Sequence, residues 1–493
     1  MKHKIYRIVC TALCCAPLLA TAQTGGKITS PQQLYEEGES LFRQKAFAAA
    51  MPPLQAFIKQ TDAEGAPVSA AGNKEEAEYM LVCAEYELRT PNSIELLREY
   101  LDTYPDTPHA NRICALIASA YFFEGKYDDA LAMFNSSRLD LLSNEERDDM
   151  TYRLATCYLK TGNVKEAAIW FETLRSTGSR YTADCTYYLA YIRYSQQRYD
   201  DALNGFLSLQ ENAKYEALVP YYIAEIYLIK KNYDKAEIVA QNYLSAYPNQ
   251  KYTGEMYRIQ GTADYHFGEY HEAIKAFGSY LKDNAEPAPR RDALYMLGMS
   301  YYRTGVYSQV PVTLGEVTAN KDALTQNAYL HMGLAYLQLA DKNKARMAFE
   351  QAAASDADLK IKEQASYNNA LCIHETSYSA FGESVTVFEN FLNEFPNSAY
   401  ADKVSSYLIE VYMNTRSYDA ALKSIERITH PGRAILEAKQ KILFQLGTQS
   451  FANTQFEQAI GCFNQSIALG GYNLQTKADA LYWRGESYYR LIR

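Results

Sequence analysis

One alanine recurs along most of this chain at an interval that matches the length of a pair of helices. It occupies the same place in a short repeated phrase, at Ala130, Ala167, Ala202, Ala236, Ala273, Ala345, Ala421 and Ala459. The first four intervals are 37, 35, 34 and 37 residues, and Val310 and Ser384 fill the two longer gaps. A fixed period in this range indicates a solenoid, in which each unit packs only against its neighbours. Because solenoids build long concave surfaces and seldom carry out chemistry, the period predicts a binding function.

Each repeat has the pattern of two amphipathic helices joined by a short turn. In residues 217–248 the first helix carries Ala224 and Tyr227, the second carries Ala236, and Pro248 ends the unit. Apolar residues three or four positions apart mark one face of a helix, and proline cannot continue a helix. Alanine at a helix crossing lets two backbones approach closely, and a larger side chain there would overpack the joint at a cost of about 1–3 kcal/mol.

These positions resemble the tetratricopeptide repeat, whose signature places small and aromatic residues at fixed positions on both helices. The matching residues are Ala118, Tyr121, Ala130, Phe134, Ala155, Tyr158, Ala167, Phe171, Gly261, Ala273, Phe277, Gly333, Tyr336, Ala345 and Phe349, with Pro105, Pro248 and Pro396 at the terminal position. The aromatic position departs from the pattern at Arg193, Asp264 and Ser450. The resemblance implies an all-α, right-handed superhelical solenoid of about twelve helix pairs plus a C-terminal single helix.

The first 22 residues have the pattern of a signal peptide rather than that of a repeat. Three basic residues precede an apolar stretch at residues 8–20, and a small-x-small cleavage pattern ends at Ala22. The apolar stretch is too short to remain as a membrane span, and no other segment reaches the length of a transmembrane helix. We therefore expect a flexible lead-in at residues 23–30 and a solenoid over residues 31–493, with a loop at residues 61–73.

Charge and motifs argue against nucleic-acid binding, catalysis and metal binding. The formal net charge is −9, and removal of the signal peptide leaves −12, whereas a nucleic-acid partner would call for a basic face. The six cysteines that follow the signal peptide lie singly, and we expect most to be free core residues. His266 and His271 flank a turn, so they do not share a helix face as a metal pair would. The sequence therefore predicts a protein that is not an enzyme and that binds no metal and no cofactor.

Tyrosine is unusually abundant, at 44 of 493 residues, and many tyrosines fall on the predicted first helices. In the family that the chain resembles, the first helix of each pair lines a concave groove. The candidate binding residues at or beside such positions are Tyr152, Tyr187, Tyr191, Tyr194, Tyr221, Arg258, Tyr265, Tyr295, Tyr302, Arg303 and Tyr367. Tyrosine combines rigid contact area with a polar tip, and the two arginines are suited to pair with an acidic group of a ligand. The alternative is that the tyrosines pack neighbouring helices.

Three phrases, at residues 100–106, 243–249 and 391–398, resemble segments of periplasmic envelope proteins. Those proteins are the helical lipoprotein of the outer-membrane barrel-assembly machine and the accessory protein of the Tol–Pal system, and the cleavage junction resembles a Bacteroidetes-type exported protein. We expect a periplasmic scaffold that binds an unidentified protein or peptide in a tyrosine-lined groove, in cell-envelope assembly or maintenance. The alternatives are a module that binds cell-wall glycan or accompanies an enzyme, and the N-terminal part of a longer protein.

The last predicted helix, residues 478–493, lacks the second helix that would cover it. It carries Leu481, Trp483, Tyr488 and Leu491, whereas the outer face of a terminal repeat is usually polar. We therefore expect either that the natural chain continues beyond Arg493 or that this helix associates with a partner or a second copy.

Overall fold

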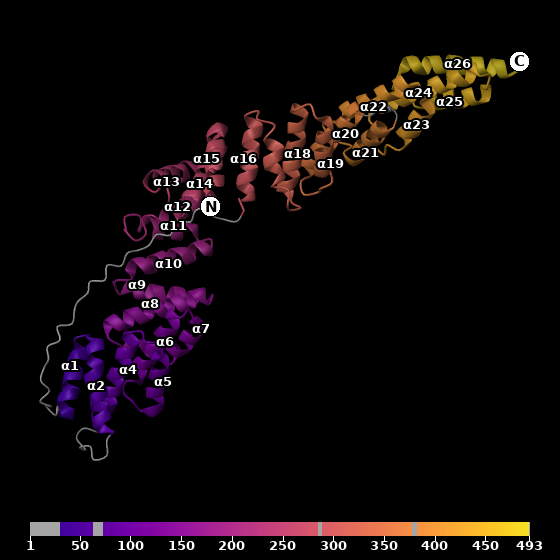
Figure 1. Ribbon diagram of the computed structural model, residues 1–493. Helices are drawn as coiled ribbons and strands as arrows, with labels where there is room; N and C mark the ends of the chain where they lie inside the picture. The colour runs from indigo at the N-terminus through magenta and orange to yellow at the C-terminus, as the bar shows by residue number, and fades with distance from the viewer. Residues whose placement is uncertain (1–29, 63–71, 284–287, 377–381, 493) are drawn as a thin grey trace, which may run out of the picture. The chain divides into compact units, whose positions relative to one another are not determined.

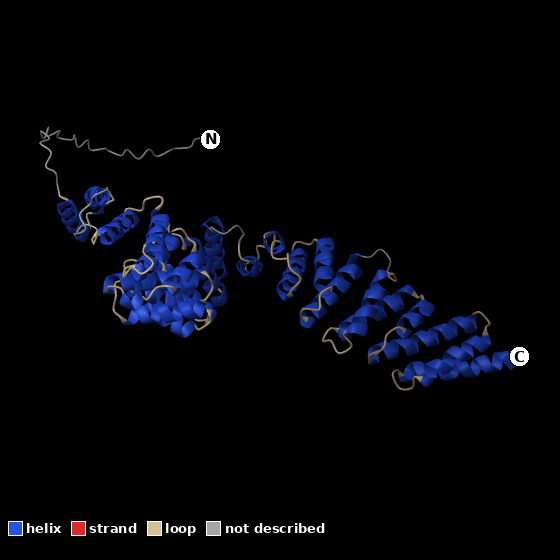
Figure 2. Ribbon diagram, turned by 90° about the horizontal axis from the view of Figure 1, so that it is seen from below, coloured by secondary structure: helices blue, strands red, loops and turns tan. Residues whose placement is uncertain are grey.

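The computed structural model describes residues 30–62, 72–283, 288–376 and 382–492. Within these ranges the secondary structure is helical and contains no strand (Figure 2). The predicted signal peptide, most of the predicted lead-in and most of the predicted loop at residues 61–73 lie outside the described residues. The described residues form two compact units, which divide between Gly205 and Phe206.

The first unit is a succession of helices in which most helices pack against the next one along the chain (Figure 1). Its helices are α1 (Pro31–Arg43), α2 (Phe47–Thr61), α4 (Lys74–Glu87), α5 (Ser93–Thr103), α6 (Ala110–Phe123), α7 (Tyr127–Asn135), the 3-10 helix η1 (Leu139–Leu141), α8 (Asn144–Lys160), α9 (Val164–Ser176), α10 (Thr182–Ser195) and most of α11 (Tyr199–Leu207).

The second unit continues the same pattern of paired helices. Its helices are α12 (Val219–Ile229), α13 (Tyr233–Ala246), α14 (Thr253–Phe267), α15 (Tyr270–Asp283), α16 (Arg291–Arg303), α17 (Val310–Gly315), α18 (Ala323–Gln338), α19 (Lys342–Ala353), α20 (Leu359–Thr376), α21 (Glu383–Glu394), α22 (Ala401–Thr415), α23 (Tyr418–Glu426), α24 (Arg433–Ala452), α25 (Phe456–Ala468) and α26 (Leu474–Ile492). The described part of the chain thus contains twelve helix pairs and one last helix, which confirms the predicted all-α architecture.

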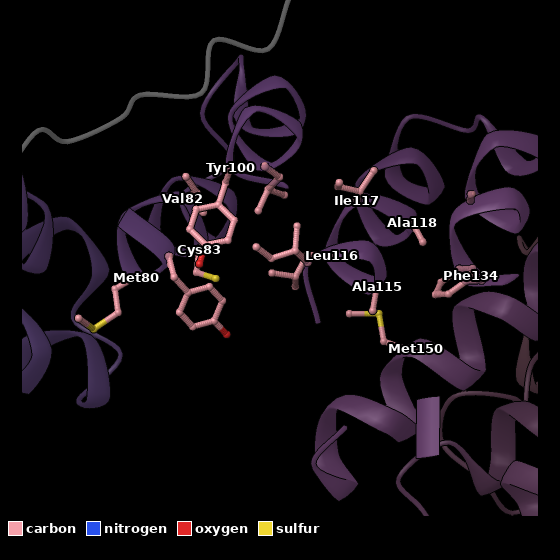
Figure 3. Close-up of a cluster of buried hydrophobic side chains, with 14 of the residues drawn as sticks. Met80, Val82, Cys83, Tyr100, Ala115, Leu116, Ile117, Ala118, Phe134 and Met150 are labelled. Atoms are coloured by element: carbon pink, nitrogen blue, oxygen red, sulfur yellow. The ribbon is translucent and has the colours of Figure 1, made fainter. Parts of the chain in front are cut away.

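Most pairs have a small residue on the first helix and a large residue 16 positions later on the second helix, and where the small residue is glycine the two are in contact. At four such glycines an added Cβ atom would lie only 2.4–3.0 Å from the facing side chain, which is too close for a side chain larger than glycine's. The four pairs are Gly261 with Phe277, Gly298 with Leu314, Gly333 with Phe349 and Gly447 with Phe463. In the first unit Ala118 and Phe134 have the same spacing and belong to one buried cluster (Figure 3).

The recurring alanines lie at the crossing of the two helices, as the sequence predicts. All eight are completely buried, and so are Val310 and Ser384, which replace alanine in two repeats. The six cysteines within the described residues are free, and four of them are buried, which agrees with a role as small core residues.

The last helix packs through one face only. Trp483 of α26 lies edge-on to Phe451 of α24, with ring centroids 5.1 Å apart. The sequence had indicated that Trp483 is uncovered, but in the structure its ring packs against the preceding helix pair. Tyr482, Tyr488 and Leu491 remain exposed. Self-association through α26 therefore stays a prediction.

Asp264 on α14 stands where most repeats carry an aromatic residue. Its side chain is buried, and its Oδ2 atom has no hydrogen-bond partner among the described residues. Burial, together with the charges of Glu237 on α13 and of Glu269 and Glu272 near the start of α15, raises the pKa of Asp264 to about 7. The folded protein therefore holds this proton more tightly than the unfolded chain does.

We predict that the free energy of unfolding falls as the pH rises from about 4, near the pKa of an unfolded aspartate, to about 7, and that Asp264 adds no further slope above that range. Asp264→Asn should remove this part of the slope and raise stability at pH 8 by a few kcal/mol, as measured by urea denaturation across pH. The exposed Asp234→Asn on α13 is the matched control and should keep the wild-type slope. An unchanged slope in Asp264→Asn would show that this carboxyl is ionised in the folded protein at all these pH values.

Candidate functional site

All eleven candidate residues lie on the first helices of their pairs. The first unit contributes Tyr152 from α8 and Tyr187, Tyr191 and Tyr194 from α10. The second unit contributes Tyr221 from α12, Arg258 and Tyr265 from α14, Tyr295, Tyr302 and Arg303 from α16, and Tyr367 from α20. The candidates therefore fall into two sets, one in each unit, and each set is described by itself.

A cavity of about 360 Å³ runs along three successive first helices of the second unit. It extends over α12, α14 and α16, reaches α18, and is called the α12–α16 groove below. Its lining residues are Glu225, Leu228, Ile229, Tyr233, Arg258, Thr262, His266, Arg290, Asp292, Tyr295, Met296 and Leu324. Two of the candidates, Arg258 and Tyr295, are therefore part of one groove.

Apolar side chains and tyrosine form much of this lining. Ile229 at the end of α12 is 42% exposed, although it is a large aliphatic side chain. Tyr295 is half-buried, and its hydroxyl donates a hydrogen bond to Asn327 Oδ1 on α18 at 3.0 Å. Burial raises the pKa of Tyr295 to about 12, so its hydroxyl stays protonated at neutral pH. The groove thus presents apolar contact area beside fixed polar groups, which is typical of binding pockets.

A buried charge network lies beneath the groove. The Arg258 side chain is 3% exposed; its Nε atom donates to Glu255 Oε2 at 2.7 Å, and its Nη2 atom contacts Glu225 Oε1 on the neighbouring helix α12. Burial and the nearby Arg290 lower the pKa of Arg258 to about 10, which leaves it charged at neutral pH. Arg258 was expected to pair with an acid of the ligand, but the protein itself supplies its carboxylates. The residue therefore ties α12 to α14.

Arg303 lies close enough to three candidate tyrosines of α14 and α16 to affect their pKa values. Its charge opposes the effect of burial on the pKa values of Tyr265, Tyr295 and Tyr302, all of which are raised. Tyr302 also packs edge-on against His331 of α18, with ring centroids 5.4 Å apart. Arg303 itself is exposed and borders a shallow depression over the start of α15. It remains accessible to a ligand acid, unlike Arg258.

Three candidate tyrosines are used at joints between repeats. Each stacks face to face on an aromatic residue just before the first helix of the next repeat, with ring planes within 11° and centroids 4.2–4.4 Å apart; the pairs are Tyr152 with Tyr181, Tyr221 with Tyr252 and Tyr367 with Tyr400. Tyr79 and His109 form the same contact, at 3.6 Å. For these tyrosines the packing alternative applies, and Tyr367 is a core residue with 7% exposure.

The partners in these joints were missed from the sequence, although a signal for them was present. His109, Tyr252 and Tyr400 each lie four residues after the terminal proline of a repeat, at Pro105, Pro248 and Pro396. An aromatic residue at that spacing places a ring at the N-terminus of the next first helix, where it meets the preceding repeat.

The three tyrosines of α10 belong to the first unit. Tyr191 is 38% exposed. Tyr187 lies edge-on to Tyr188 at 5.4 Å, and Tyr194 lies edge-on to Tyr199 at 5.9 Å. These residues form an aromatic surface on the first unit, and their role as binding residues stays a prediction.

No group of three or more His, Cys, Asp or Glu side chains able to hold a metal ion occurs in the described part of the chain. His266 stacks on Tyr233, with ring centroids 4.1 Å apart, which gives it a packing role beside the groove. None of the helices in the described ranges is long and apolar enough to cross a membrane.

Helix pairs that stack through small and aromatic residues define an α-solenoid of interaction repeats. Family models of the tetratricopeptide repeat match residues 115–181, 260–308 and 326–359. These three segments are tetratricopeptide repeats, and no catalytic family is indicated. No curated protein matches it.

Solved structures similar to this chain include other tetratricopeptide repeat proteins. One from Parabacteroides merdae is 16% identical, with a TM-score of 0.35, and the match covers 53% of this chain and 99% of that one. The C-terminal part of a repeat-containing protein from Cytophaga hutchinsonii is 16% identical, with a TM-score of 0.37 and coverage of 50% and 97%. The corresponding domain of P58(IPK) is 13% identical, with a TM-score of 0.27 and coverage of 71% and 99%.

We predict that Arg258→Met destabilises the protein by about 3–5 kcal/mol, because it leaves the buried Glu225 without its counter-charge. Arg303→Met, at an exposed position one repeat further along, is the control and should change stability by less than about 0.5 kcal/mol. Both values come from chemical denaturation at pH 7. Equal losses in the two variants would contradict a structural role that is specific to Arg258.

Proposed function

We propose that the second unit binds an extended segment of a partner protein along the α12–α16 groove. Tetratricopeptide repeats are protein–protein interaction scaffolds. The observation that carries the proposal is the cavity itself, because three consecutive first helices line it and the large aliphatic side chain of Ile229 is open to solvent in it. A contact surface that extends over several repeats suits a long ligand better than a compact one.

The lining also indicates how such a segment is held. Arg258 is paired with Glu225 and Glu255, and Arg290 is paired with Asp292 at 2.9 Å, so the charges of the groove are largely balanced within the protein. A ligand gains little by supplying charge there. It gains more from apolar side chains placed against Leu228, Ile229 and Met296, together with hydrogen bonds to the fixed polar groups.

The buried network and the stacked joints support this proposal through preorganisation. Arg258 connects α12 to α14, and Tyr221 stacks on Tyr252 at the same joint. Helices held in this way do not need to be ordered when a ligand binds, which lowers the entropic cost of association.

The test uses peptides selected from a random displayed library on the purified protein, with affinities measured by fluorescence anisotropy. We predict that Ile229→Asp weakens binding at least about tenfold, equivalent to about 1.4 kcal/mol, because it places a charge in the apolar lining. Ile238→Asp is the matched control, since Ile238 is 57% exposed on the second helix of the same pair and lies outside the groove. Binding that survives Ile229→Asp, or that is lost equally in both variants, contradicts this site. Binding of soluble cell-wall glycan fragments in place of peptides would favour the glycan-binding alternative.

We further propose that the protein is exported and acts in the periplasm, in assembly or maintenance of the cell envelope. The basic start, the apolar stretch and the small residues before Gln23 support export. The net charge of −12 after cleavage is compatible with a protein partner and unfavourable for nucleic acid. The phrases at residues 100–106, 243–249 and 391–398 support the envelope as the place of action through their resemblance to envelope proteins.

We predict that the protein isolated from cells begins at Gln23 or at its pyroglutamate form. Intact-mass spectrometry of the periplasmic fraction measures this directly, and an Ala22→Arg variant should accumulate uncleaved because the small residue of the cleavage pattern is lost. A full-length chain in the cytoplasmic fraction, or a lipid attached to Cys15, would contradict the proposed processing.

A further inference from the structure

The first unit contains a second cavity, of about 410 Å³, that none of the candidate residues lines. It lies between the end of α4, the turn that follows it, and the helices α5, α6 and α8, and is called the α4–α8 pocket below. Part of its lining is apolar and comes from Ile94, Leu116 and Met150. Leu116 and Met150 both belong to the core cluster of this unit (Figure 3), so this side of the pocket rests on fixed structure.

Two arginines border this pocket and share one aromatic ring. The Cζ atom of Arg89 lies 4.6 Å from the centroid of the Phe123 ring, and that of Arg153 lies 4.9 Å from it. The attraction between a guanidinium group and an aromatic face favours both positions. Phe123 is 51% exposed, so the ring and the two charges lie where a ligand can reach them.

Hydrogen bonds fix Arg153. Its Nη1 atom donates to Ser119 Oγ, which is buried and also accepts a hydrogen bond from the Tyr86 hydroxyl at 2.8 Å. Asp149 Oδ2 is 3.9 Å from Arg153 Nη2, beyond hydrogen-bond distance. Among the described residues no carboxylate oxygen lies within 4 Å of the exposed Arg89 guanidinium. Neither arginine therefore has a carboxylate hydrogen-bonded to it in the described part of the unit.

The carboxylates of the pocket are instead held by basic groups outside its lining. Glu146 Oε1 accepts a hydrogen bond from Arg112 Nε at 2.7 Å, and Glu124 forms an ion pair with Lys126 at 2.9 Å. Asp149 contacts Arg180 and also accepts a hydrogen bond from the Tyr181 hydroxyl at 3.1 Å. Glu87, the fourth acidic residue, is exposed. Arg153 keeps only the long ion pair to Asp149, and Arg89 has no carboxylate partner among the described residues, so a ligand carboxylate can complete the pairing of both.

We propose that the α4–α8 pocket binds a ligand that carries a carboxylate next to an apolar group. The carboxylate contacts the guanidinium groups of Arg89 and Arg153, which suit it because each offers several N–H donors in one plane. The apolar group packs against Leu116, Met150 and the Phe123 ring. The cavity volume falls in the range of about 300–1,000 Å³ that is typical of pockets for small ligands. The carboxylate belongs either to a free small acid or to an acidic side chain of a peptide.

The test is isothermal titration of the full chain with four probes. Phenylacetate and its uncharged amide represent the free acid, and the capped tripeptides acetyl-Leu-Glu-Leu-amide and acetyl-Leu-Gln-Leu-amide represent the side chain. We expect saturable binding of at least one acid, with a Kd of about 1 mM or tighter, and at least tenfold weaker binding of the matching amide. Binding of phenylacetate alone identifies a free acid as the ligand, and binding of the Glu peptide alone identifies a side chain; either supports the pocket.

Variants locate the binding. Arg89→Gln should weaken the acid probe at least fivefold and leave the melting temperature unchanged, because Arg89 is exposed. Arg98→Gln is the matched control, since Arg98 likewise packs over an aromatic ring, that of Tyr121, but lies outside this pocket. Ile229→Asp in the other unit should leave this binding intact, so failure here is distinguishable from failure of the groove proposal. The inference is overturned by equal binding of acids and amides, by the absence of binding of all four probes, or by equal losses in Arg89→Gln and Arg98→Gln.

Discussion

The rest of this structure depends on the contact, present in most pairs, between a small residue on the first helix and a large one on the second. Where glycine occupies the small position, the facing side chain fills the space that a Cβ atom would need, as Phe349 does at Gly333. The contact fixes one face of the first helix against its partner. A different face is left to form a surface, and three such faces in succession make the α12–α16 groove.

A second set of contacts sets one repeat against the next, and it accounts for part of the abundance of tyrosine. At the joint where Tyr221 stacks on Tyr252, two further aromatic residues precede the terminal proline. They are Tyr243 and Tyr247, whose ring centroids are 5.2 Å apart. Tyr100 with Tyr104 and Phe391 with Phe395 repeat that arrangement in the corresponding helices. The same residue type thus serves packing at the joints and contact area in the grooves, and its position relative to the next repeat decides between the two roles.

The sequence was sufficient for the fold because its determinants are local. The period, the alanine phrase and the terminal prolines lie within single repeats, so the helix pairs could be predicted from the residues alone. The candidate site was predicted only in part, because exposure depends on residues one repeat away. Arg258 is buried because Glu225 of the preceding repeat meets it, and Tyr367 is buried partly because Tyr400 of the next repeat covers it. The α4–α8 pocket could not be predicted, since it needs four helices and a turn to meet.

The small-to-large contact is tested most directly by two glycine-to-alanine substitutions in one helix pair. Gly447 of α24 faces Phe463, and an added Cβ atom would lie 2.6 Å from the Phe463 ring, whereas Gly461 of α25 has open space at the same distance. Denaturant titration should show Gly447→Ala destabilised by about 1–3 kcal/mol through overpacking, and Gly461→Ala stabilised by up to about 1 kcal/mol through helix propensity. Equal stabilisation of both variants would contradict the claim that this contact holds the repeats together.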